Sequence, residues 1–207
     1  MRKIRLLSLL LAIAGLLFVS INPLVAAYYS SGAYSSSSYG SCTYGDTCSI
    51  TIGSSGPISL NVTPTPAASC TINSDTVSVL TDDANGYILT LSDGNTDTSL
   101  VNGSASISAT SGTFDSPIAL TADTWGYRVD SLGNFGNGPT TSQNNTSLSS
   151  TTFAAVQPSS GAADTIASTS TVADPAVNTK VWYGVCADTT VTSGSYSTQV
   201  TYTALSN

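Results

Sequence analysis

The sequence contains no histidine and no glutamate, and charged residues make up only 8% of its 207 residues. These two residue types supply many of the general acids and bases of hydrolases. Aspartates and Lys180 would have to replace them, and no Ser-x-x-Lys arrangement surrounds Lys180. We therefore expect the chain to have no enzymatic activity and no cofactor.

Positive charge is also scarce. Three of the five basic residues precede residue 6, which leaves Arg128 and Lys180 against twelve aspartates in the rest of the chain. Binding to phosphates needs clustered lysines and arginines, and a net negative surface repels them. The sequence thus excludes a nucleic-acid partner and disfavours binding to anionic lipids.

Residues 1–27 have the three parts of an export signal. A basic start is followed by an apolar run at 6–21, which ends at Asn22 and Pro23, and then by small residues that a signal peptidase recognises. We expect a signal helix here, with cleavage after Ala27 and release to the cell surface or the medium. The alternative is an uncleaved anchor that contacts the membrane through this segment alone, although the run is shorter than the roughly 20 residues of a bilayer span.

Cysteine is limited to four residues, Cys42, Cys48, Cys70 and Cys186. An even number in an exported chain predicts two disulfides, with three pairings open. We expect the close pair, Cys42 and Cys48, to close a small loop, and Cys70 and Cys186 to join distant strands. The alternative, a zinc site of four thiolates, matches no familiar spacing of zinc ligands.

The rest of the chain divides into a leader and one domain. Residues 28–47 are a Tyr/Ser/Gly stretch without branched aliphatic residues, which predicts a flexible leader. Residues 48–207 contain short runs in which apolar and polar residues alternate, with turn signals such as Asn85-Gly86 between them. We predict a single all-β domain, an Ig-like or jelly-roll antiparallel β-sandwich of roughly 8–11 strands.

Two groups of residues are candidates for ligand contact. Asp93, Asn95 and Asp97 place oxygen atoms at alternate positions, as at the start of a calcium loop, but the EF-hand pattern then fails. The sequence leaves open a calcium site and an ordinary turn. The second group consists of rings that would stack on a sugar or a partner if exposed, although alternation directs at least half of them into the core. These rings are Trp125, Tyr127, Trp182 and Tyr183.

Four segments carry a family resemblance. They are Asn-Gly-Tyr-x-Leu-x-Leu at 85–91, Thr-Trp-Gly-Tyr-Arg-Val-Asp at 124–130, Val-Trp-Tyr-Gly-Val at 181–185 and Ser-Gly-Ser-Tyr-Ser-x-x-Val-Thr-Tyr-Thr-Ala at 193–204. In this order they resemble a group of uncharacterised exported β-sandwich proteins of small-genome candidate-phylum bacteria. The chain is more distantly similar to WxL-type cell-wall-binding domains, although it lacks a clear Trp-x-Leu pair, and to a secreted pilin-like spore-coat domain. The resemblance implies a surface location and a non-catalytic role, and it supplies no binding residues.

The sequence therefore favours a secreted or cell-surface structural or adhesive protein. Such a protein would act through strand-edge assembly or through a Ser/Thr/Tyr-rich face. Its partner would be a cell-wall polymer, another surface protein or a further copy of the chain. The alternative is a carbohydrate-binding module that uses exposed Trp and Tyr rings, and an enzyme based on paired aspartates is a third, less favoured hypothesis.

Overall fold

The structure is a computed structural model that describes residues 17–28 and 48–207. The described residues form fourteen strands and no helix, so the predicted all-β fold is confirmed. Within these ranges, no helix could cross a membrane. The expected leader at 28–47 lies outside the described residues except for Tyr28, as does the first part of the expected signal.

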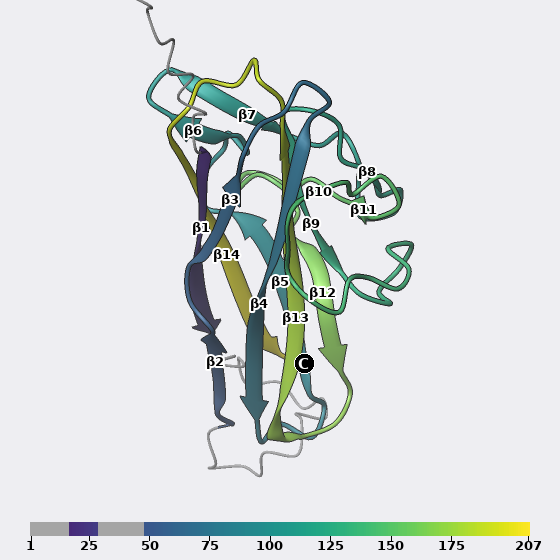
Figure 1. The fold of residues 1–207 in the computed structure, drawn as a ribbon. Coiled ribbons are helices and arrows are strands. Elements are labelled where there is room, and N and C mark those ends of the chain that lie inside the picture. The colour runs from purple at the N-terminus through teal and green to yellow at the C-terminus, as the bar shows by residue number, and fades with distance from the viewer. Residues whose placement is uncertain (1–16, 29–47) are drawn as a thin grey trace, which may run out of the picture.

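The strands form a β-sandwich of two layers (Figure 1). Layer A consists, in order across the sheet, of β3 (Ile58–Val62), β1 (Leu17–Tyr28), β14 (Ser195–Ser206), β5 (Tyr87–Asp93) and β12 (Asp164–Thr169). In layer B, β4 (Ser69–Thr81) is flanked on one edge by β2 (Ile50–Ser54) and β10 (Gln143–Thr146), and on the other by β13 (Ala173–Ala187) and β9 (Thr124–Val129).

Short strands connect and cover the two layers. The layers are linked through β6 (Leu100–Asn102) and β7 (Ala105–Ala109), and a small separate sheet consists of β8 (Ile118–Ala119) and β11 (Thr152–Phe153). Two pairings differ from the antiparallel sheet that we predicted, because β1 runs parallel to β14 and β7 runs parallel to β9. The strand number exceeds our expectation because several of these elements are too short to show a period of two.

Strand β1 lies where we expected part of a signal helix. Residues 17–28 are extended and pair with strands on both sides. Pro23 disfavours a helix here because it lacks an amide hydrogen and clashes with the preceding turn. The pairing with β3 ends at Ile21, before Pro23, so that edge requires no donor from the proline.

The main core lies between the layers, and β14 shows how the sequence builds it. Every second residue from Tyr196 to Ala204 is buried, whereas the residues between them are exposed or half-buried. This is the division of the strand into an apolar and a Ser/Thr/Gln face that its alternation predicts. Facing strands of layer B contribute Val77, Val79 and Tyr183 to the same core.

A second apolar cluster lies on the outer face of layer B. Trp182 and Cys186 point away from the main core because they alternate along β13 with Val181, Tyr183 and Val185. Leu120, Leu148 and Phe153, from the segments around β8 and β11, cover them. The excursion between β9 and β12, which has no clear period in the sequence, thus helps to seal this face.

Candidate contact surface

The four rings that the sequence offered for ligand contact are buried. Trp125, Tyr127 and Tyr183 are 0% exposed, and Trp182 is 1% exposed. These four rings therefore form no exposed row, and the burial that alternation indicated for at least half of them applies to all four. Trp125, Tyr127 and Tyr183 lie in the main core, and Trp182 lies on the opposite face of layer B. Alternation did not specify which rings point inward, and it could not show that loops cover the face on which Trp182 lies.

The polar atoms of the two indoles are also paired inside the protein. Trp125 donates its Nε1–H to the carbonyl oxygen of Thr98 at 2.9 Å, and Trp182 donates to Oδ2 of Asp130 at 2.8 Å. A buried indole that finds an internal acceptor is a structural group. The carbohydrate-binding alternative thus loses the side chains on which it was based.

Buried tyrosines join the layers through their hydroxyl groups. The hydroxyls of Tyr183 and Tyr202 are 2.6 Å apart, and Tyr127 donates to Oδ2 of Asp164 at 2.8 Å. Burial raises the pKa of each of the three tyrosines well above its ordinary value. Burial also raises the pKa of Asp164. These hydroxyls stay protonated near neutral pH and hold the sandwich together.

The calcium candidates act as turn residues in this structure. Asp93 is 1% exposed, and its carboxylate accepts hydrogen bonds from the amide of Asn95 at 2.8 Å and the hydroxyl of Thr198 at 3.1 Å. Asn95 and Asp97 are exposed, and Asp97 accepts a bond from the amide of Ser99 at 2.9 Å. Burial raises the pKa of Asp93, whereas the bond from the Ser99 amide lowers the pKa of Asp97. Among the described residues, no group of three or more carboxylates or cysteines converges on one point.

The predicted long-range disulfide is present. Cys70 of β4 and Cys186 of β13 are directly paired in the sheet and are bonded to each other across 116 residues of sequence. Cys48 is disulfide-bonded as well, whereas its expected partner, Cys42, lies outside the described residues. The zinc alternative is wrong for Cys70 and Cys186, because their sulfurs are bonded to each other.

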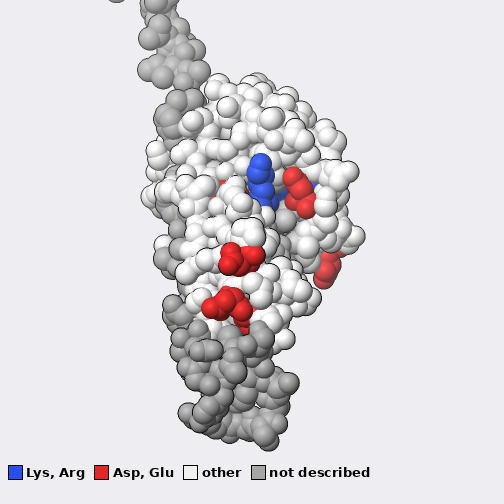
Figure 2. Space-filling view, turned by 90° about the horizontal axis from the view of Figure 1, so that it is seen from below, with Lys and Arg blue, Asp and Glu red and all other residues white. Residues whose placement is uncertain are grey.

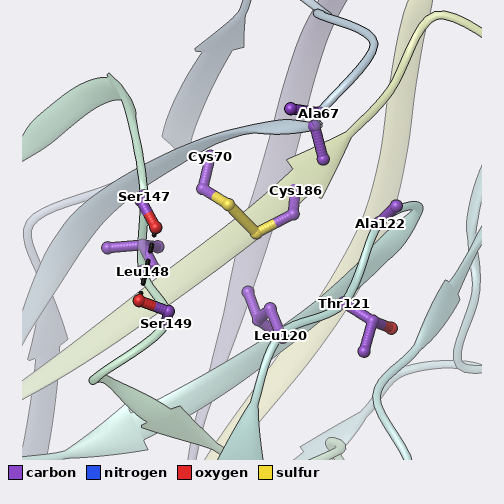
Figure 3. A pocket seen from close by; sticks show the side chains of 10 residues that line it. Ala67, Cys70, Leu120, Thr121, Ala122, Ser147, Leu148, Ser149 and Cys186 are labelled. Carbon is purple, nitrogen blue, oxygen red and sulfur yellow. Dashed lines mark hydrogen bonds between the residues drawn. A yellow bond between two sulfur atoms is a disulfide. The ribbon is translucent and has the colours of Figure 1, made fainter.

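A pocket of about 400 Å³ lies beside this disulfide (Figure 3). Leu120 and Leu148 provide apolar walls, and Thr121, Ser147 and Ser149 provide the hydroxyl groups. All of the lining residues are uncharged, and none is an efficient acid, base or nucleophile on its own. The pocket lies over the second core cluster, and we assign it no chemistry.

Both basic side chains of the domain are engaged by neighbours. Arg128 is 1% exposed, and its guanidinium contacts Asp130 at 3.1 Å and donates to the carbonyl oxygens of Phe135 and Thr152. Lys180 is exposed, and its Nζ lies 5.3 Å from the centre of the Trp182 ring. On the part of the surface that is described in Figure 2, a few red groups and little blue lie among white residues. Contact with this part of the surface would depend on uncharged groups.

The outer face of layer A is the best candidate for contact. It carries, on β14, Ser197, Gln199, Thr201, Thr203 and Leu205; on β5, Ile88, Thr90 and Ser92; and on β12, Thr165 and Ser168. We call this set the hydroxyl face. At one end, Ile88 and Leu205 are cross-strand neighbours that are 38% and 44% exposed. Alternation in the sequence predicted the polar side of β14, whereas the apolar pair depended on knowing which strands are adjacent.

A scan against protein-family models finds no match for this chain, and neither does a search of curated proteins. The resemblance to exported β-sandwich proteins thus stays a prediction from the four sequence segments.

Proposed function

We propose that the protein is a non-catalytic structural or adhesive component of the cell surface or the extracellular space. Its partner would be a cell-wall polymer, another surface protein or a further copy of the chain. The hydroxyl face carries this proposal, because it is a broad uncharged surface with an apolar pair at one end. Such a surface suits contact with neutral polymers or strands better than contact with charged ligands.

The use of reactive side chains inside the fold supports the same proposal. The aspartates Asp93, Asp130 and Asp164 hold turns, an arginine and a tyrosine. The buried hydroxyls of Tyr127, Tyr183 and Tyr202 are hydrogen-bonded within the sandwich. Groups committed in this way contribute to stability and are poorly placed to transfer protons to a substrate.

Two sequence features support a location outside the cytoplasm. The first 27 residues have the composition of an export signal. The disulfide between Cys70 and Cys186 is a bond that persists in oxidising compartments. Export and a non-catalytic surface role are consistent with each other and with the family resemblance.

Fractionation of cells that produce the full chain tests the proposal. We expect the protein in the cell-wall or medium fraction, and we expect purified protein to sediment with isolated cell-wall material or with itself. Confinement to the cytoplasm would contradict the location. Strictly monomeric protein without affinity for cell-wall material or surface proteins would contradict the structural or adhesive role.

A further inference from the structure

Strand β1 lies between β14 and β3 and connects them within layer A (Figure 1). Residues 18–28 pair with residues 195–205 of β14, and residues 17–21 pair with β3. Within the described ranges, β3 forms a ladder with no other strand. Without β1, both β3 and a long edge of β14 would present unpaired backbone groups, which are costly when buried and adhesive when exposed.

The burial pattern of β14 determines which kind of sequence can pair as a strand between β3 and β14. Every second β14 residue that faces β1 in the register, from Tyr196 to Ala204, is buried. An occupant therefore needs an apolar residue at every second position. Positions 19, 21, 23, 25 and 27 of the chain are Val, Ile, Pro, Val and Ala, and Ile21 is 0% exposed. The Tyr/Ser/Gly sequence at 29–47 contains no such run.

The connection between β1 and the next strand is longer than its own domain requires. Strands β1 and β2 contact each other, yet 21 residues, 29–49, separate them in the sequence. Because Cys48 is disulfide-bonded and we expect Cys42 as its partner, the loop 42–48 would be closed, and the remaining residues can span up to roughly 50 Å when extended. The connection is therefore long enough to carry β1 to a neighbouring molecule, where the same strand would make the same contacts.

We propose that residues Leu17–Tyr28 of one copy occupy the place between β3 and β14 of a second copy. Each copy then donates one strand and accepts one, so that copies are linked through layer A. This inference rests on the proposed function and adds to it the way in which the surface protein assembles. The hydroxyl face, which includes the outer side of β14, is repeated along such an assembly.

The proposal sets a condition on export. Cleavage after Ala27 would leave only Tyr28 of this strand, so the exported chain must begin ahead of Leu17. Residues 12–14, Ala-Ile-Ala, provide a second small-residue pattern behind a shorter apolar run. Sequencing the N-terminus of the exported protein tests this condition directly, and a chain that begins at Tyr28 overturns the proposal.

Disulfide trapping in the exported full chain tests the exchange. Ser20 is paired in the register with exposed Ser197 on β14 and with exposed Ser59 on β3. We expect Ser20→Cys/Ser197→Cys and Ser20→Cys/Ser59→Cys to yield mostly covalent dimers and larger species on non-reducing gels. The matched control, Ser20→Cys/Thr203→Cys, places its second thiol six positions along β14, about 20 Å away. It should stay monomeric.

Each outcome decides the question. Covalent species larger than the monomer, specific to the two in-register pairs, support exchange between copies. A disulfide within single chains, found by peptide mapping, shows that β1 serves its own domain and overturns the proposal. Equal trapping in the control overturns it too, because the register would then play no role.

Folding of each variant is checked by the near-ultraviolet circular dichroism of the buried Trp125 and Trp182. If a double variant fails this check, a mixture of Ser20→Cys and Ser197→Cys single variants replaces it, and the heterodimer is the readout. Failure of exchange leaves the cell-surface role standing, because fractionation measures that role separately.

Discussion

Pairs of polar residues inside the sandwich form hydrogen bonds that fix how the layers meet. Asp164 accepts the hydroxyl of Tyr127, which is 0% exposed, and Asp93 accepts the hydroxyl of Thr198. Because such groups lose their hydration on folding, their protonation equilibria differ between the folded and unfolded chain. Stability must therefore depend on pH at identifiable residues.

Asp164 and Asp97 should show opposite pH dependence. Burial raises the folded pKa of Asp164 above its ordinary value of 3.8, so its contribution is full below that pH and is lost as the pH rises through the raised pKa. The amide of Ser99 lowers the pKa of Asp97, so its contribution is present above pH 3.8 and is lost as the pH falls.

Both effects are measured by denaturant unfolding at several pH values between about 2.5 and 7, a range that includes the ordinary pKa of an aspartate. The free energy of unfolding of the wild type minus that of Asp164→Asn should fall as the pH rises. The same difference for Asp97→Asn should increase. Parallel slopes for the two variants would contradict this assignment.

The Cys70–Cys186 disulfide should make one of the largest single contributions to stability. It joins neighbouring strands of layer B across 116 residues of sequence. A crosslink over a loop of that size lowers the entropy of the unfolded chain by an amount worth about 4–5 kcal/mol. We expect Cys70→Ala/Cys186→Ala to lose about that free energy of unfolding in urea. A loss below about 1 kcal/mol would mean that the unfolded chain is already constrained.

At the scale of elements, Arg128 connects β9 to the segment that covers layer B. Its guanidinium donates to the carbonyl oxygens of Phe135, Gly136 and Thr152 and contacts Asp130. A lysine in this position has one charged nitrogen and cannot satisfy the same fork of acceptors. The conformation of residues 131–153 therefore depends on this arginine.

Arg128→Lys should loosen that covering segment before it unfolds the sandwich. We expect a loss of about 2 kcal/mol of stability, because carbonyl oxygens lose their donors, and faster cleavage within residues 131–150 by chymotrypsin or thermolysin. Mass spectrometry of the first fragments locates the cut. Lys180→Arg, at an exposed position, is the control and should leave the cleavage rate unchanged. First cuts elsewhere in the variant would contradict the role of Arg128.

The elements also show why the sequence predicted some features and missed others. Strand β14 alternates over many residues, so both its existence and its faces were predictable. The later part of β13 is a continuous β-rich apolar run, so its existence was predictable but its faces were not. Strand β1 was not predictable, because an apolar segment that follows a basic start has the composition of an export signal whichever conformation it adopts. The burial of Trp182 was not predictable, because the segments that cover it are short, show no hydrophobic period and lie far away in sequence.

At the scale of the whole molecule, charge is sparse and the two layers expose different surfaces. The outer side of layer B is covered around Trp182 and Cys186 by the segments around β8 and β11, whereas the outer side of layer A is the hydroxyl face. The two sides of the sandwich are therefore not equivalent as contact surfaces. Since twelve aspartates and few cations give every copy a net negative charge, uncharged contacts must outweigh repulsion when copies or acidic polymers approach.

The apolar end of the hydroxyl face should supply much of that contact. Ile88 and Leu205 are neighbours across β5 and β14 and are already exposed, so Ile88→Ser/Leu205→Ser removes apolar contact area with little loss of folding stability. We expect binding to isolated cell-wall material, or association between copies, to weaken about tenfold, as a loss of roughly 1.4 kcal/mol would produce. The matched control is Leu80→Ser/Ile118→Ser, which changes residues that are 40% and 38% exposed on β4 and β8, outside the hydroxyl face. Sedimentation with cell-wall material and ultracentrifugation across concentrations give the two readouts. Equal weakening in both double variants would show that general surface hydrophobicity, rather than the hydroxyl face, holds the partner.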